Sequence, residues 1–161
     1  MTAPRIGTLP DDVSLHVAAT PERLYALLTD VAGMGRLSPE CTGGRWLDGA
    51  AGPVVGARFK GTNKRGPARW STTNTVVVAE PGRAFAFETK QSGTRWRFDL
   101  APDAGGQGTV VTESRAEFAP RSFVAKAFAT VLLGGVASHE DEVRKGMAAT
   151  LERLKALAEA S

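Results

Sequence analysis

The chain has 161 residues, of which 42% are hydrophobic and 23% are charged, and its formal net charge is +3. This composition is typical of an ordinary globular domain and excludes a chain that is disordered throughout. The length suits one domain whose core is large enough to fold without disulfides or a structural metal. Because Cys41 is the single cysteine, an intramolecular disulfide is excluded as well.

The sequence carries no pattern of export or membrane insertion. The first ten residues hold one Arg and no apolar run, so they do not resemble a signal peptide. No segment reaches the roughly 18 consecutive apolar residues that a spanning helix requires. We therefore expect a cytoplasmic protein, with residues 1–10 as a tail and residues 11–160 as one domain.

A strand and a helix are predicted first along the chain. Residues 12–18 alternate between apolar and polar side chains, which is the period of a half-buried strand. Thr20 and Pro21 are typical of an N-cap and a first helical position. Apolar residues at helical spacing follow as far as Val31, and a second short helix or turn is expected over 34–38.

Six further strands are predicted between Cys41 and Phe118. Turn-forming Gly and Pro residues separate them, and such short links force consecutive strands to pair antiparallel. Alternation along these strands places aromatic side chains on one face and basic side chains on the other. The predicted strands cover 42–47, 57–64, 68–79, 83–90, 94–101 and 108–118.

The end of the chain is predicted to be helical. A helix is expected from about residue 121, interrupted at Gly134-Gly135 and continued to Glu159. The order is therefore a strand, one or two helices, six strands and a long C-terminal helix, which is an α+β arrangement.

Three segments carry a family resemblance. They are Met34-Gly-Arg-Leu-Ser-Pro-Glu-Cys-Thr-Gly-Gly-Arg-Trp46, Gly56-Ala-Arg-Phe-Lys-Gly-Thr-Asn63 and Gly146-Met-Ala-Ala-Thr-Leu-Glu-Arg-Leu-Lys155. With the order of elements, they resemble the START-like (SRPBCC) superfamily, in its actinobacterial form. That superfamily includes polyketide cyclase/dehydrase-like proteins, lipid-transfer domains and the plant abscisic-acid receptors.

The resemblance implies a helix-grip fold. A curved seven-stranded antiparallel sheet would wrap the long C-terminal helix, and two short helices after the first strand would close one end of a cavity. The aromatic face would then be concave and the basic face convex. Residues expected to line the cavity as ligand-binding residues are Phe59, Trp70, Asn74, Phe85, Phe87, Trp96, Phe98, Val111, Glu113, Phe128, Leu132 and Met147. From the sequence alone, a plain core explains the same aromatic residues and is the favoured interpretation; the resemblance is what adds a cavity.

Glu113 is the most specific of these candidates. It lies two residues after Val111 on the same predicted strand, so the two side chains point to the same face. The strand is also similar to the receptor strand whose glutamate lines the hormone pocket. In another register it would face solvent. Asn74 could bond either a ligand or a neighbouring side chain, because buried amides need partners. Lys60 is predicted to face outward, so the receptors' ligand-pairing lysine has no counterpart here.

Motifs of nucleophilic, metal and phosphate chemistry are missing from the sequence. His16 and His139 are far apart and are expected to be structural or solvated, so neither a metal nor a cofactor is predicted. The favoured function is binding or transport of a hydrophobic small molecule such as a lipid, polyketide or isoprenoid. The alternative is a polyketide cyclase, aromatase or dehydratase-like enzyme with Glu113 as its acid or base.

A basic segment leaves a third function open. Residues 57–97 hold nine Lys and Arg against two acids, an excess of seven positive charges. The basic face could make an interaction module, and a transient membrane contact is possible. Nucleic acid is not expected as a partner, because stacking aromatics would point away from that face. The protein would be a monomer or a homodimer.

Overall fold

The computed structural model describes residues 12–118 and 136–160, with the backbone alone for 136–143. The predicted helix from about residue 121 to the glycine pair falls outside these ranges. The elements in chain order are β1 (Val13–Val17), α1 (Pro21–Leu28), the 3-10 helix η1 (Val31–Arg36), β2 (Cys41–Trp46), β3 (Arg58–Arg65), β4 (Ala68–Glu80), β5 (Ala84–Thr89), β6 (Thr94–Pro102), β7 (Thr109–Glu117) and α3 (Val136–Glu159).

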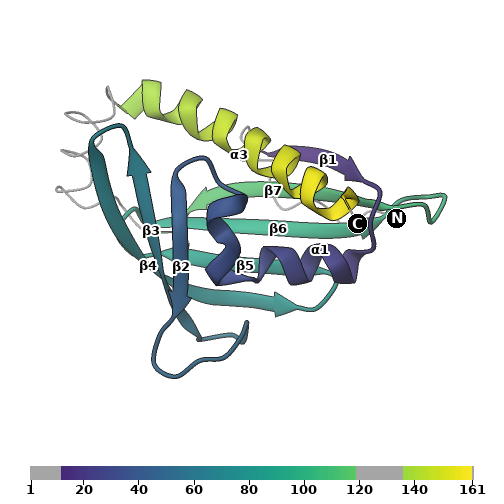
Figure 1. Cartoon of the computed structure of the whole chain (residues 1–161), viewed down its shortest axis with the longest axis horizontal. Helices are drawn as coiled ribbons and strands as arrows, with labels where there is room; N and C mark the ends of the chain where they lie inside the picture. The colour runs from purple at the N-terminus through teal and green to yellow at the C-terminus, as the bar shows by residue number, and fades with distance from the viewer. Residues whose placement is uncertain (1–11, 119–135, 161) are drawn as a thin grey trace.

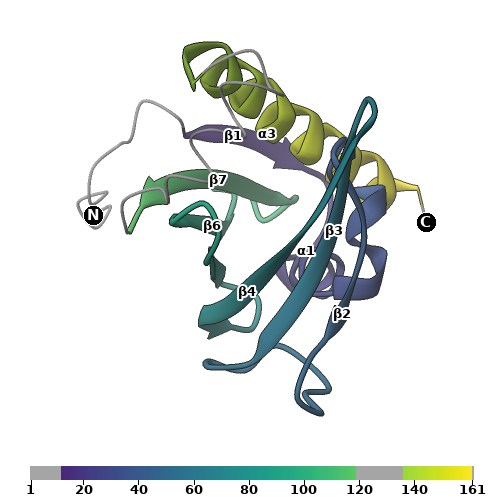
Figure 2. The same cartoon turned by 90° about the vertical axis from the view of Figure 1, so that its left-hand side faces the viewer.

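The strands form one antiparallel sheet in the order β1-β7-β6-β5-β4-β3-β2. Each strand from β2 to β7 pairs with its neighbour in sequence, as the short turns predict, and β1 closes the sheet against β7. The sheet curves, and α3 lies across its concave side with α1 and η1 near one end (Figure 1). Figure 2 shows the curvature, with β2 and β3 bending away from β6 and β7. This arrangement confirms the predicted helix-grip fold.

Two bulges accompany the bending. The register shifts between Val76 and Val78 where β4 pairs with β5, and between Cys41 and Gly43 where β2 pairs with β3. An extra residue on one strand increases the local twist and bends the strand. Both bulges lie in the half of the sheet formed by β2 to β5.

The boundary between the two helices after β1 differs from the predicted one. The Thr20 hydroxyl accepts from the backbone N–H of Arg23, and Pro21 occupies the first turn, as expected. However, α1 ends at Leu28, because the Thr29 hydroxyl bonds back to the Tyr25 carbonyl and Asp30 then caps η1. Val31 therefore begins the second helix and does not belong to the first.

The core fills the end of the concave face that α1 covers. Leu24, Leu28, Phe85 and Val111 are almost fully buried there, together with the α3 side chain Leu154. None of the helices that the structure describes is long and apolar enough to cross a membrane. Away from this core, the sheet and α3 diverge.

Candidate functional site

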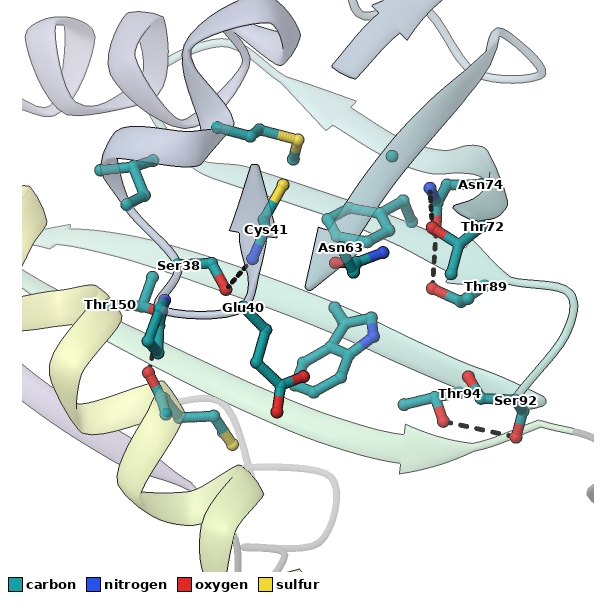
Figure 3. A pocket seen from close by; sticks show the side chains of 18 of the residues that line it. Ser38, Glu40, Cys41, Asn63, Thr72, Asn74, Thr89, Ser92, Thr94 and Thr150 are labelled. Atoms are coloured by element: carbon teal, nitrogen blue, oxygen red, sulfur yellow. Dashed lines mark hydrogen bonds between the residues drawn. The ribbon is translucent and has the colours of Figure 1, made fainter. Parts of the chain in front are cut away.

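A cavity of about 1130 Å³ lies between the concave face of the sheet and the helices. Strands β3 to β7 supply one wall, and the link over 37–41 with the first described turns of α3 supplies the other. Figure 3 shows side chains from both walls pointing into this space. Lys64, Gly66, Ser71 and Gln91 belong to the lining and are exposed, which locates the mouth near the β3–β4 and β5–β6 turns.

Aromatic rings make the apolar part of the wall. Phe59 packs edge-to-face on Phe87 with ring centroids 5.1 Å apart, and Trp46 packs on the far side of Phe59 at 5.6 Å. Trp96 is the cross-strand partner of Phe87 on β6. Such edge-to-face pairs favour defined ring orientations at Phe59 and Phe87.

Glu113 faces the cavity from β7. Its side chain is 4% exposed, and its Oε2 atom has no hydrogen-bond partner among the residues that the structure describes. Burial raises the pKa of this carboxyl well above its usual value, because the charged form loses its hydration. The group therefore favours the protonated form, which can donate one hydrogen bond and accept others.

Asn74 lies in the centre of the wall, held by its neighbours. Its Nδ2 donates to the Thr72 hydroxyl at 3.1 Å and to the Phe59 carbonyl at 3.4 Å, and the Thr89 hydroxyl donates to its Oδ1 at 2.7 Å (Figure 3). Both amide hydrogens are thus used within the protein. The second lone pair of Oδ1 is the part of the amide that a ligand could still reach.

A comparison with protein families shows to which family the chain belongs. Residues 12–159 match the family described as polyketide cyclase/dehydrase and lipid transport. The chain belongs to this family. The START-like superfamily resemblance in the sequence is thereby confirmed.

Solved structures of the same fold agree with this membership. The Polyketide_cyc-like protein Cgl2372 from Corynebacterium glutamicum is 31% identical over 92% of this chain and 88% of its own, with a TM-score of 0.57. The KanY protein is 20% identical over 96% and 99%, with a TM-score of 0.66. The di-domain ARO/CYC StfQ from the steffimycin biosynthetic pathway is 16% identical over 92% of this chain and 50% of its own, with a TM-score of 0.69. No curated protein matches the chain significantly.

This family member brings most of the predicted ligand-binding residues to the cavity wall. Phe59, Trp70, Asn74, Phe87, Trp96, Phe98, Glu113 and Met147 line it. Phe85 and Val111 do not, since both have no exposed surface and belong to the core. Tyr25 of α1 packs edge-to-face on Phe85 at 6.3 Å, so a helix covers that position. Phe128 and Leu132 fall outside the described residues.

Sequence analysis missed the polar part of the lining, although a signal was present. Asn63, Thr89, Thr94 and Arg115 each have the same parity as an aromatic or acidic residue predicted to face inward. Alternation therefore already assigned them to the concave face. The signal was overlooked because hydroxyl and amide side chains are unremarkable on any strand.

Cys41 also lies in the wall, which its sequence environment did not predict. It is half-buried, and its Sγ donates to the Gly43 carbonyl at 3.4 Å. Burial raises the pKa of this thiol, so the thiolate is disfavoured. This environment fits a small structural side chain.

The convex face carries Arg58, Arg95 and Arg97, as the alternation predicts, and each of the three is paired. Arg58 bonds Asp48, Arg95 bonds Glu88, and Arg97 bonds Asp99 at 3.0 Å. His16, on the same side, contacts Asp103 at 2.6 Å. Within the described residues, no three His, Cys, Asp or Glu side chains come together as a metal site.

Proposed function

We propose that this chain binds a hydrophobic small molecule, such as a lipid, polyketide or isoprenoid, in the cavity between the sheet and α3. The observation that carries the proposal is the cavity of about 1130 Å³ beside aromatic side chains. Protein interiors are close-packed, so aromatic residues that merely filled a core would leave no space of this size. Ligand pockets typically measure about 300–1,000 Å³.

Affinity would come from the apolar wall. Each Å² of apolar surface removed from water contributes about 25 cal/mol, and the rings of Phe59, Phe87 and Trp96 present such surface. Because these rings are already oriented by one another, a ligand would lose little free energy in ordering them. The protonated Glu113 would orient the ligand by donating a hydrogen bond to a carbonyl or hydroxyl oxygen.

Native mass spectrometry of protein from bacterial expression, followed by extraction of any bound molecule, tests the proposal. We expect a discrete apolar adduct that is lost on denaturation and reduced in Trp96→Ala and Glu113→Gln. Glu152→Gln, an exposed position on α3, is the matched control and should retain the adduct. An adduct-free mass, together with unchanged thermal stability in the presence of lipids, polyketides and isoprenoids, would refute ligand binding.

A second candidate function is catalysis of the cyclase or dehydratase type. The family description and the buried Glu113 favour it, because an acid with a raised pKa can still donate a proton near neutral pH. The two functions separate in one experiment on the extracted ligand. Conversion of the ligand by the wild type, with binding but no conversion by Glu113→Gln, would identify an enzyme. Binding without conversion by either protein would identify a carrier.

A further inference from the structure

The concave wall changes from apolar to polar along β5 and β6. On β5 the inward residue after Phe87 is Thr89, and on β6 the inward residue before Trp96 is Thr94. The paired register aligns these changes, because Phe87 opposes Trp96 and Thr89 opposes Thr94. Asn74 on β4 continues the polar row beside Thr89. Thr89, Thr94 and Asn74 therefore mark a polar end of the cavity, which lies toward the mouth. Trp70 of β4 also lies at this end, opposite Asn63 of β3.

Positive charge gathers at the polar end. The described lining holds four cationic side chains, which are Lys64, Arg65, Arg115 and Lys145. It holds two carboxyls, Glu40 and the buried Glu113. The described lining therefore holds two more cationic than acidic side chains. Among the described lining residues, Glu113 is the one ionisable side chain at the opposite, aromatic end.

Three of the four cations surround the link between η1 and β2. The backbone N–H of Lys64 donates to the Glu40 carbonyl at 2.8 Å, which ties the β3–β4 hairpin to this link. Nη1 of Arg65 is 3.8 Å from Oε1 of Glu40. Pro39 lies against Gly146 of α3, the residue after Lys145. One sheet hairpin and one helix thus present cations at the same rim.

Glu40 offsets only one of the four cations. Its carboxylate points into the cavity (Figure 3), where Arg65 balances it. Lys64 and Lys145 are exposed and have long, adjustable side chains, while Arg115 belongs to the opposite wall on β7. An anion at the mouth would therefore meet the positive charge of Lys64 on the β3–β4 hairpin and of Lys145 on α3.

From this distribution we infer that the cavity selects an amphiphile with an anionic head group. The inference rests on the proposed function. The apolar body of the ligand lies against Phe59, Phe87 and Trp96, and its carboxylate or phosphate stays at the mouth beside Lys64 and Lys145. A head group at the mouth keeps part of its hydration, so its charge is neutralised without full burial.

Ligands that share one chain length and differ only in the head group test the contribution of the head group separately from that of the tail. The probes are dodecanoate, dodecyl phosphate, 1-dodecanol and dodecylammonium, titrated below their aggregation concentrations. Trp70 and Trp96 line the cavity, so their fluorescence reports binding, with calorimetry as a second readout. We expect at least one anionic probe to bind about tenfold more tightly than dodecanol, with an advantage that shrinks between 0.05 and 0.5 M salt. The carboxylate and phosphate arms show which anion is preferred.

Charge-reversal variants locate the head group. Lys64→Glu combined with Lys145→Glu should abolish the preference for the anionic probe and leave dodecanol affinity unchanged. Lys60→Glu combined with Lys90→Glu changes the net charge equally, but neither residue lines the cavity, so this control should keep the preference. Glu40→Gln removes the carboxylate from the rim and should strengthen binding of the anion severalfold.

The outcomes distinguish this inference from the function on which it rests. Equal affinity for the anions and dodecanol, or tighter binding of dodecylammonium, would overturn the anionic preference and leave hydrophobic binding intact. An equal loss of preference in the control pair would overturn the assignment to the mouth. Failure of all four probes, together with an adduct-free native mass, would reject the proposed function itself.

Discussion

Glu113 shows how much one inward position can matter. Its neighbours on β7 with the same parity are the core residue Val111 and the cationic Arg115, so the strand passes from core to cavity wall at this carboxyl. A Gln of nearly equal size would keep the shape and remove the titration. The substitution therefore isolates the electrostatic contribution of the carboxyl.

We expect Glu113→Gln to change how stability depends on pH. Folding raises the pKa of Glu113 above the ordinary value of 4.5. A group with a raised folded pKa stabilises the native state fully below its unfolded pKa, and this stabilisation is lost as pH rises through the folded pKa. Between those two values the free energy of unfolding of the wild type should fall by up to about 1.4 kcal/mol per pH unit.

Urea denaturation of ligand-free protein at a series of pH values above 4.5 provides the measurement. Glu113→Gln should lack this component of the slope, so its stability relative to the wild type should increase with pH. Glu152→Gln should follow the wild type. Parallel curves for the wild type and Glu113→Gln would mean that the carboxyl is solvated in the folded protein.

At the scale of elements, α1 and the strand before it hold the end of α3 in place. Arg23 of α1 donates from Nε to the Ala158 carbonyl at 3.0 Å and from Nη2 to the Leu157 carbonyl at 3.2 Å. Oε2 of Glu159 accepts from the backbone N–H of Ala18 at 2.8 Å. The last carbonyls of a helix lack partners within it, and a cation there also complements the helix dipole. These contacts set where α3 crosses the sheet.

Arg23→Ala should therefore loosen the end of α3. We expect a loss of about 1–2 kcal/mol in the free energy of unfolding, because a charge-assisted pair of hydrogen bonds disappears from a partly exposed site. Arg23→Lys should fall in between, since one ammonium cannot match the two-pronged contact. Arg153→Ala, exposed on α3, should change stability by less than about 0.5 kcal/mol.

Hydrogen exchange of the α3 amides distinguishes local from global effects. Faster exchange over the last turns in Arg23→Ala, with the sheet unchanged, is the expected pattern. Wild-type exchange rates in that variant would mean that the contacts seen at Leu157 and Ala158 do not anchor the helix.

For the whole molecule, the fold separates a core that carries stability from a cavity that carries binding. Phe85 and Phe87 are consecutive inward residues of β5, yet Phe85 is fully buried under Tyr25 while Phe87 lines the cavity. Removing a packed side chain creates a new void, whereas removing a wall side chain enlarges an existing one. The two classes of residue should therefore differ in their energetic cost.

Phe85→Ala and Trp96→Ala test this separation directly. We expect Phe85→Ala to reduce the free energy of unfolding by about 3–5 kcal/mol, the usual cost of truncating a packed aromatic residue. Trp96→Ala should cost less than half as much and should mainly reduce ligand affinity. Urea denaturation followed by circular dichroism measures both without relying on tryptophan fluorescence. Similar losses in the two variants would indicate that Trp96 is packed as core.

The sequence by itself determined the elements and their order, because local chemistry controls them. Gly and Pro at the turns, the Thr20-Pro21 helix start and the period-two alternation each act over a few residues, and the strands lie within a residue or so of their predicted bounds. Alternation also put Glu113 on the same face as Val111 but left open which face that was; the structure places Glu113 on the concave side. The boundary between α1 and η1 was misplaced, because Thr29 and Asp30 end one helix and cap the next with side-chain bonds that periodicity does not register.

Only the tertiary structure decided which inward residues meet a void. Alternation treats Phe85 and Phe87 alike, since both point to the same face; the position of α1 buries one and leaves the other in the cavity. Likewise, Lys64 and Lys145 are 81 positions apart in sequence and become neighbours of one link through Glu40 and Pro39. A strand's pattern is set by its own residues, but the space above it depends on how far the opposing layer stands away.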